Sequence, residues 1–212
     1  TEEPRIIRQF KKNLEFTGGI AVKYDQSTLF GGGTHQALAT GEAIGRRFHS
    51  APVVRLSDAK QMQLGHAAEA DARWRIYAFA GKADSSTPGS PIHRLADWLE
   101  TNASSPIVRH TRKDEDIDAV IDFRAVFQQT FDQLAYENMP SLLKPKTGKL
   151  GLQDHEKAFC VDHKGAGDIF DMRGVDRNEG CMVVVRPDQY VAHVLPLDGF
   201  DELSAFFAGI LR

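Results

Sequence analysis

The stretch Trp74-Arg75-Ile76-Tyr77-Ala78-Phe79-Ala80 is apolar on both faces of an extended chain, and Arg75 is its one charged residue. Strands that are buried on both sides have this pattern, because neither face of the strand meets water. We therefore predict a central strand here. A layered α/β domain follows from it, since such a strand needs packed elements on each side.

Helical and extended patterns alternate after this strand. Beyond a loop at 82–89, Ser90 and Pro91 have the residue types of an N-cap and a first helical position, and the apolar stripe that follows predicts a helix ending near Asn102. Ala119–Val126 is interpreted as the next strand. A short helix is expected after it, on the apolar residues Phe127, Phe131, Leu134 and Ala135. Strand, helix and strand in this order predict a parallel pair joined by a right-handed crossover.

A hairpin and a helix close the chain. Cys181–Arg186 and Tyr190–Leu195 are joined across Pro187-Asp188-Gln189, which predicts two antiparallel strands. Asp198 has the residue type of an N-cap for a final helix, whose apolar stripe is Phe200, Leu203, Phe207 and Ile210. Shorter strands are expected at Val53–Leu56, Met62–Leu64 and Ala158–Asp162. The order predicts a mixed sheet flanked by helices.

The first fifty residues differ from the rest. Pro4–Phe16 predicts an amphipathic helix that needs a partner surface, with the apolar stripe Ile6, Ile7, Phe10 and Leu14. From Gly19 to Ser50 we find no hydrophobic pattern that could build a core, and we interpret this part as an extended arm. The chain is therefore divided into a helix and arm at 1–50 and a compact domain at 51–212. We expect self-association through the stripe, or a disordered N-terminus.

Composition excludes several classes of protein. The chain has 212 residues, of which 42% are hydrophobic and 26% charged, so it is globular and soluble, and no apolar run is long enough for a membrane span. A net charge of -3 disfavours nucleic acid and anionic lipid as partners. Two cysteines and the lack of a signal segment favour the cytoplasm. Because the chain begins with Thr1, we expect it to derive from a longer one.

Three stretches together carry a family resemblance: Ala51-Pro52-Val53-Val54-Arg55-Leu56-Ser57-Asp58, Arg73–Gly81, and Val183-Val184-Val185-Arg186-Pro187-Asp188-Gln189-Tyr190-Val191-Ala192. They are similar to the C-terminal domain of phenol 2-monooxygenase and related FAD-dependent aromatic hydroxylases, including hydroxybenzoate hydroxylases. The element order is itself the thioredoxin-like arrangement. The resemblance implies a thioredoxin-like dimerisation domain. It also implies that the helix and arm before Ser50 connect this domain to a preceding flavin domain.

The resemblance also implies a division of labour in the parent enzyme. Preceding domains would hold FAD and the phenolic substrate, and NADPH and oxygen would drive hydroxylation of a phenol or hydroxybenzoate. This chain has no Gly-x-Gly-x-x-Gly. Gly31-Gly32-Gly33 follows no clear strand and is interpreted as part of the arm, and Gly167-Asp168 resembles a short flavin motif without its surrounding pattern. We therefore predict no catalytic, cofactor-binding or metal-binding residue here, and a structural role in packing and homodimerisation.

A thioredoxin-like fold raises the alternative of thiol redox chemistry, which needs a low-pKa cysteine at the start of a helix. Lys82–Thr87 stands where redox members carry their cysteines and contains no sulfur. His155–Ala158, interpreted as preceding the third core strand, lacks the cis-proline of those members. Cys160 and Cys181 are expected to be buried and inert. A stand-alone redox protein using either cysteine remains the alternative, and a third hypothesis is a separately encoded partner of an oxygenase.

Other candidate residues favour structural roles. A metal site from Cys160, Asp162, His163 and Cys181 is disfavoured, because alternation along a strand directs His163 away from Cys160 and Asp162. Arg186-Pro187-Asp188 is interpreted as a turn braced by its arginine. Trp74 and Trp98 are expected in the core or an interface. The mixed-charge stretch around His110 is expected to be a solvated loop.

Overall fold

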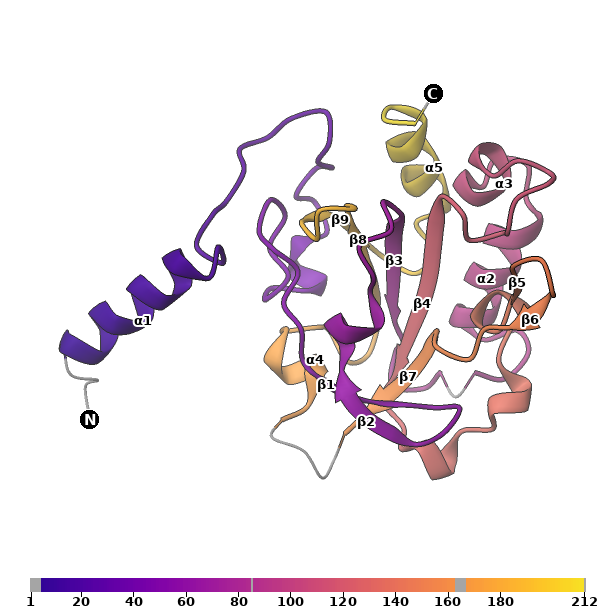
Figure 1. Cartoon of the computed structure of the whole chain (residues 1–212), viewed down its shortest axis with the longest axis horizontal. Helices are drawn as coiled ribbons and strands as arrows, with labels where there is room; N and C mark the ends of the chain where they lie inside the picture. The colour runs from indigo at the N-terminus through magenta and orange to yellow at the C-terminus, as the bar shows by residue number, and fades with distance from the viewer. Residues whose placement is uncertain (1–4, 85, 163–166, 212) are drawn as a thin grey trace.

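A seven-stranded mixed sheet forms the centre of the computed structural model, which describes residues 5–84, 86–162 and 167–211 (Figure 1). The strand order is β2-β1-β7-β4-β3-β8-β9. The strands of this sheet are β1 (Pro52–Arg55), β2 (Lys60–Gln63), β3 (Trp74–Phe79), β4 (Ile121–Phe127), β7 (Ala158–Val161), β8 (Cys181–Val185) and β9 (Val191–Leu195). The helices are α1 (Arg5–Thr17), α2 (Pro91–Thr101), α3 (Pro106–His110), α4 (Ile169–Met172) and α5 (Phe200–Ala208). A small separate hairpin consists of β5 (Lys146–Thr147) and β6 (Leu152–Gln153).

The predicted central strand is β3, and each of its residues is buried. It pairs in parallel with β4, where Trp74 lies opposite Ile121, and antiparallel with β8. The connection from β3 to β4 runs through α2, and β8 forms the predicted hairpin with β9 before α5. These elements confirm the thioredoxin-like mixed sheet flanked by helices, because a βαβ unit and a hairpin with a helix share one sheet.

Each face of the sheet has its own core because side chains alternate along a strand. On the face covered by α2, α3 and α5, Ile76 packs with Leu95 and Phe207 (Figure 1). The opposite face carries Tyr77 and Phe79, and the segment before β1 and α4 cover it.

The arm between residues 20 and 50 is part of this second core. Phe48 is buried and stacks on Tyr77, with ring centroids 4.5 Å apart. The arm also pairs with the outer edge of β9, where the Val191 N–H donates to the Arg46 carbonyl at 2.8 Å. The sequence shows no hydrophobic period here, because the residues that anchor the arm are isolated along the chain. The division between 1–50 and 51–212 stays a prediction, but the two parts share a core.

Two helix predictions were wrong in detail. Phe127 belongs to the end of β4, and a 3₁₀ helix at Phe131–Gln133 replaces the expected α-helix. The final helix begins one residue later than expected, with Gly199 as N-cap, and the Asp198 side chain does not cap it. The Asp198 backbone carbonyl instead accepts from the Phe200 N–H at 2.8 Å, so a turn takes the place of the side-chain cap.

Candidate functional site

The loop after β3 is the place where a thiol enzyme of this fold would carry its chemistry. Here Asp84 is buried, and its carboxylate accepts hydrogen bonds from the backbone N–H groups of Ser86 and Ile92, each at 2.8 Å. The amino end of a helix favours a negative group, because its first N–H groups have no partner within the helix. In this chain the carboxylate of Asp84 occupies the start of α2, where a thiolate would lie.

Asp84 also corrects the predicted helix cap. Ser90 is at the N-cap position of α2, but its side chain accepts no hydrogen bond from the helix. Asp84 reaches the helix from the preceding loop, eight residues before Ile92. A pattern that considers only the residue next to the helix cannot find such a cap. Ser85 lies outside the described residues.

The strand that faces this loop is β8, which pairs directly with β3. The interpretation of His155–Ala158 as the stretch before the third core strand was therefore wrong, because that stretch leads into β7, which pairs with β4 and β1. Gly180 precedes β8, has φ of +68°, and lies against the backbone after β3. No cis peptide bond occurs among the described residues.

Cys160 and Cys181 lie on opposite faces of the sheet, and both side chains are fully buried. Burial, with a smaller contribution from nearby Asp162, raises the pKa of the Cys160 thiol to about 12. Burial also raises the pKa of Cys181. A buried thiol with a raised pKa is a poor nucleophile at neutral pH, since only the thiolate attacks.

The four residues considered for a metal do not form a site in the described part of the chain. Cys160 and Cys181 point to different cores, and Asp162 accepts a hydrogen bond from Gln61 at 3.1 Å. His163 lies outside the described residues. Within residues 5–84, 86–162 and 167–211, no three histidine, cysteine or acidic side chains are grouped as metal ligands would be.

A buried cluster of charges that was not predicted from the sequence lies on the sheet face that carries Tyr77. At its centre Asp122 is fully buried, with Lys157 Nζ at 2.6 Å, Arg124 Nε at 2.8 Å and Arg75 Nε at 3.5 Å from its carboxylate oxygens. Asp118 accepts from Lys157 at 2.7 Å. The signal in the sequence was Arg75 within an apolar strand, because a buried cation requires a buried partner.

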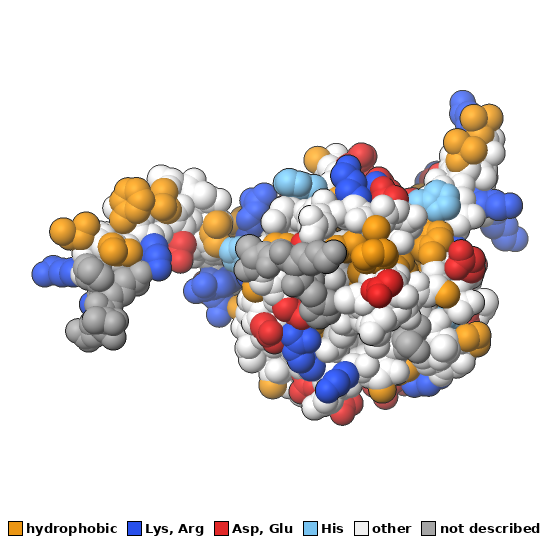
Figure 2. All heavy atoms as spheres, turned by 90° about the horizontal axis from the view of Figure 1, so that it is seen from below, with side chains coloured by type: hydrophobic (Ala, Val, Ile, Leu, Met, Phe, Trp, Pro, Cys, Tyr) orange, Lys and Arg blue, Asp and Glu red, His pale blue; other side chains and the backbone are white. Residues whose placement is uncertain are grey.

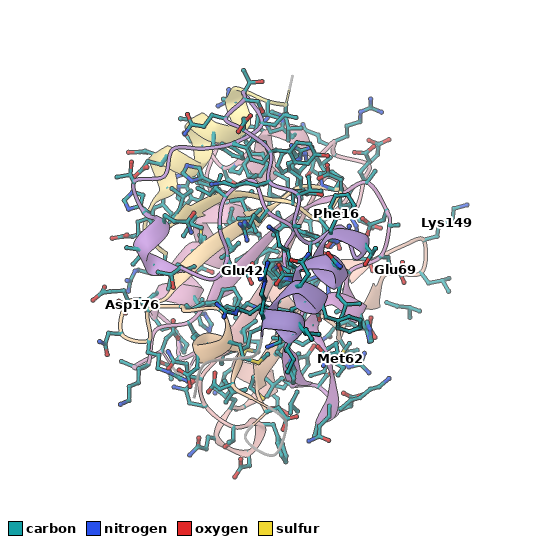
Figure 3. All side chains as sticks on the ribbon, turned by 90° about the vertical axis from the view of Figure 1, so that its left-hand side faces the viewer. Phe16, Glu42, Met62, Glu69, Lys149 and Asp176 are labelled. Carbon is teal, nitrogen blue, oxygen red and sulfur yellow. The ribbon has the colours of Figure 1, made fainter. Side chains whose placement is uncertain are left out.

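A second buried acid, Glu42, belongs to the arm itself. The carboxylate oxygens of Glu42 make no hydrogen bond within the described structure, and Arg173 Nε lies 3.4 Å from one of them (Figure 3). Burial raises the pKa of Glu42 to about 8, against the opposing effect of Arg173. The acid is therefore protonated in the folded chain at neutral pH.

This acid predicts a pH dependence of stability. Between about pH 4.5 and pH 8 unfolding releases the Glu42 proton, so the free energy of unfolding should fall as pH rises. Glu42→Gln should remove this decline and stabilise the chain by on the order of a few kcal/mol near pH 8, with little effect near pH 4. Urea denaturation across this range measures it. Parallel curves for the two proteins would contradict the prediction.

The turn Arg186-Pro187-Asp188 holds the arm in place. As predicted, the arginine braces the turn, since its Nε and Nη2 donate to Asp188 at 3.0 and 2.6 Å. Its guanidinium also lies over two aromatic rings of the arm, 5.0 Å from Phe30 and 5.6 Å from Tyr24. Cations bind the faces of aromatic rings in this way. The turn therefore connects the arm to the domain.

The glycine motifs have structural roles. Gly31 donates its N–H to the Ala192 carbonyl at 2.8 Å, and a Cβ at Gly31 would come within 2.1 Å of the His193 ring. Gly31 thus lets the arm approach β9 closely, whereas Gly32 and Gly33 have room for a Cβ. Asp168 of the Gly-Asp pair caps α4, accepting from the Phe170 N–H at 2.8 Å.

The tryptophans and His110 also lie in structural positions. Trp74 is buried and packs edge-on against Phe207, with centroids 5.5 Å apart. Trp98 is half-buried and stacks on Phe200 at 4.9 Å. His110 ends α3 and is half-buried, so it lies in a short helix where a loop was expected.

The helix α1 presents an exposed apolar surface. The predicted helix is confirmed over Arg5–Thr17, and none of its residues is buried. It projects from the domain, and its apolar side chains are visible at one end of the molecule (Figures 1 and 2). Ile6 is 81% exposed and Phe10 63%, and basic residues Arg8, Lys11 and Lys12 share the helix. Exposed apolar surface of this kind marks an interface. No helix of the described residues is long and apolar enough to cross a membrane.

The described chain thus combines a thioredoxin-like sheet with buried thiols, a buried carboxylate at the start of α2 and an exposed apolar helix. The chain belongs to the family of phenol hydroxylase C-terminal dimerisation domains, whose family model matches residues 22–212.

Curated relatives agree with this family. The chain is 51% identical over 206 residues to a 3-hydroxybenzoate 4-monooxygenase of Comamonas testosteroni, covering 97% of this chain and 32% of the relative. It is 32% identical over 207 residues to the FAD-dependent monooxygenase terD of Aspergillus terreus, covering 96% of this chain and 34% of the relative. The chain thus spans about a third of the length of these relatives.

Two solved structures are similar to this chain at low sequence identity. A putative protein disulfide isomerase from Bacteroides thetaiotaomicron has 13% identity and a TM-score of 0.45, over 79% of this chain and 87% of that one. A reduced 2-Cys peroxiredoxin from Plasmodium vivax has 12% identity and a TM-score of 0.43, over 79% of this chain and 95% of that one.

Proposed function

We propose that this chain is the non-catalytic C-terminal part of a flavin-dependent aromatic hydroxylase, where it packs against the catalytic domains and supports homodimerisation. The parent would use NADPH, FAD and oxygen to hydroxylate a phenol or hydroxybenzoate, in the cytoplasm. FAD and NADPH would bind to the preceding domains. The curated relatives, whose names describe monooxygenases, support this parent reaction.

The observation that carries the proposal is the apolar stripe of α1. The chain spans about a third of the length of its relatives, and the proposal assigns the cover of the stripe to another part of the parent enzyme. Burying an apolar side chain of this size contributes about 1.5–3 kcal/mol, which gives four such residues a strong preference for a partner surface.

Buried thiols support the non-catalytic part of the proposal. A redox member needs an accessible thiolate at the start of α2, whereas Asp84 occupies that place and both cysteines are buried. The alternative of a redox protein using Cys160 or Cys181 would require one of these strands to open.

Thiol titration tests the proposal. The native chain should react with a thiol reagent orders of magnitude more slowly than the unfolded chain, which should show two thiols, because both are buried. The purified chain should also retain no flavin and oxidise no NADPH. Rapid modification of either cysteine at neutral pH, or a yellow protein with flavin bound, would contradict the proposal. Cys160→Ser and Cys181→Ser assign any reaction to its residue.

A further inference from the structure

The two edge strands of the central sheet differ in whether their outer backbone groups are paired. At the β9 edge the arm is hydrogen-bonded along the strand, with Arg46 accepting from Val191 and Gly31 donating to Ala192, each at 2.8 Å. At the other edge, β2 has β1 on its inner side, and no strand of residues 5–84, 86–162 or 167–211 pairs with its outer side. An unpaired edge can accept another strand.

The outward backbone groups of β2 can be identified from its pairing. The Leu64 N–H donates inward to the Ala51 carbonyl at 2.9 Å. In an antiparallel pair, alternate residues direct both backbone groups to the same neighbour, so Met62 also faces β1 while Gln61 and Gln63 face outward. The register between β1 and β2 runs without a bulge from Lys60 to Gln63, and these four residues include no proline. The edge is regular enough to extend.

Partly apolar surface flanks this edge. On the side of Gln61, a hollow of about 630 Å³ is lined by the apolar residues Val54, Ala59, Val161 and the 47%-exposed Phe131, together with Asp132 and Asp162. On the other side of the strand Met62 is half-buried (Figure 3). Hydrophobic side chains lie at the surface when the domain is seen from this end (Figure 2). A chain added to β2 would cover surface on both sides of the sheet.

We propose that β2 pairs antiparallel with β2 of a second copy, across a two-fold axis at Met62, so that two central sheets become one. A second copy is the favoured occupant because the family is one of dimerisation domains and the strand is self-complementary. This inference rests on the proposed dimerisation and gives it a geometry.

The register follows from the outward groups. With Met62 opposite Met62 of the second copy, each Gln61 faces a Gln63, and two reciprocal pairs form with two backbone hydrogen bonds each. A register that places Gln61 opposite Gln61 of the second copy forms only one such pair. The chosen register also places Lys60 opposite Leu64, so no like charges are directly opposed.

Disulfide trapping tests the register. In it the two Met62 residues form a non-hydrogen-bonded pair with Cα atoms about 4.5 Å apart, within the range of a disulfide. Met62→Cys should therefore give a covalent dimer under mild oxidation, seen on a non-reducing gel. Lys60→Cys is the matched control, because two Lys60 residues would lie about 13 Å apart and should not link. Cys160 and Cys181 are buried and should stay reduced in both variants.

A proline variant tests the edge itself. Gln61→Pro removes an outward N–H that the sheet does not use, so light scattering should show a monomer while circular dichroism shows the native fold. Gln61→Ala loses the side chain but keeps the N–H and should remain a dimer.

The outcomes separate the two proposals. A dimer that persists in Gln61→Pro and does not link in Met62→Cys would overturn the edge pairing and leave the proposed dimerisation standing. Loss of that dimer in Phe10→Asp would assign it to α1. A wild-type chain that is monomeric at all accessible concentrations would overturn both dimerisation and the edge pairing.

Discussion

Asp122→Asn is expected to destabilise the domain by about 3–5 kcal/mol, because it removes the carboxylate that Arg124 binds in the buried cluster, while Lys157 and Arg75 keep Asp118 and Asp71. Asp122 is fully buried between β3 and β7, and its carboxylate binds Lys157 and Arg124 at 2.6 and 2.8 Å. Both partners are almost completely buried, so water does not reach them to solvate the charges that are left. Few other single substitutions in the chain should have so large an effect.

Urea denaturation of both proteins at neutral pH measures this effect. Glu156→Gln is the matched control, since its side chain is 57% exposed and an exposed ion pair contributes at most about 1 kcal/mol. A loss below about 1 kcal/mol in Asp122→Asn would mean that the cluster relaxes or admits water, contrary to the structure.

The same cluster predicts that the free energy of unfolding decreases at acid pH. Burial raises the pKa of Asp122, but the charges of Arg124 and Lys157 outweigh it and lower the pKa to about 2. The unfolded chain has the ordinary higher value, so stability is present above about pH 4 and is lost as pH falls towards about 2. That loss amounts to about 2 kcal/mol for this group. It should be absent in Asp122→Asn.

Gly180→Ala is expected to be the second severe substitution, costing about 3 kcal/mol or more. Gly180 has φ of +68°, and a Cβ there would lie 2.2 Å from the Phe79 carbonyl oxygen and 2.7 Å from the Gly81 nitrogen. Both contacts are with backbone at the end of the central strand, so relief requires β3 and β8 to move apart.

Gly148→Ala is a control that separates the cost of the left-handed backbone conformation from the cost of the steric clash. Gly148 has φ of +69°, but a Cβ there meets nothing within 4 Å. This control should cost only the left-handed conformation, about 1–2 kcal/mol. Thermal unfolding of the two variants should therefore show a clearly larger loss for Gly180→Ala. Equal losses would show that the backbone at Gly180 yields easily.

Local periodicity was enough to predict the elements that build the sheet. The apolar run at β3, the stripes of α1 and α2, and the turn between β8 and β9 each lie within one window of sequence. A hydrophobic period reports which face of an element is buried, and that property needs no knowledge of the neighbour. The thioredoxin-like order followed from these elements, as did the burial of Cys160 and Cys181.

The neighbours themselves were decided by the tertiary structure. From the sequence, β7 was interpreted as the third core strand, whereas β8 is the strand that pairs with β3, because strand order depends on contacts between distant segments. Three other features also depend on contacts between residues that are separated in the sequence. They are the cap from Asp84, the stacking of Phe48 on Tyr77 and the ion pair of Arg75 with Asp122.

The amino-acid sequence by itself therefore determined the helices and strands, the two-sided burial of β3 and the absence of sulfur at the start of α2. Only the tertiary structure decided that Asp122 lies among three cations, that the arm occupies one edge of the sheet and that β2 leaves the other open. The physical reason is that charge pairing and edge exposure depend on distances between residues far apart in the chain, which no local period contains.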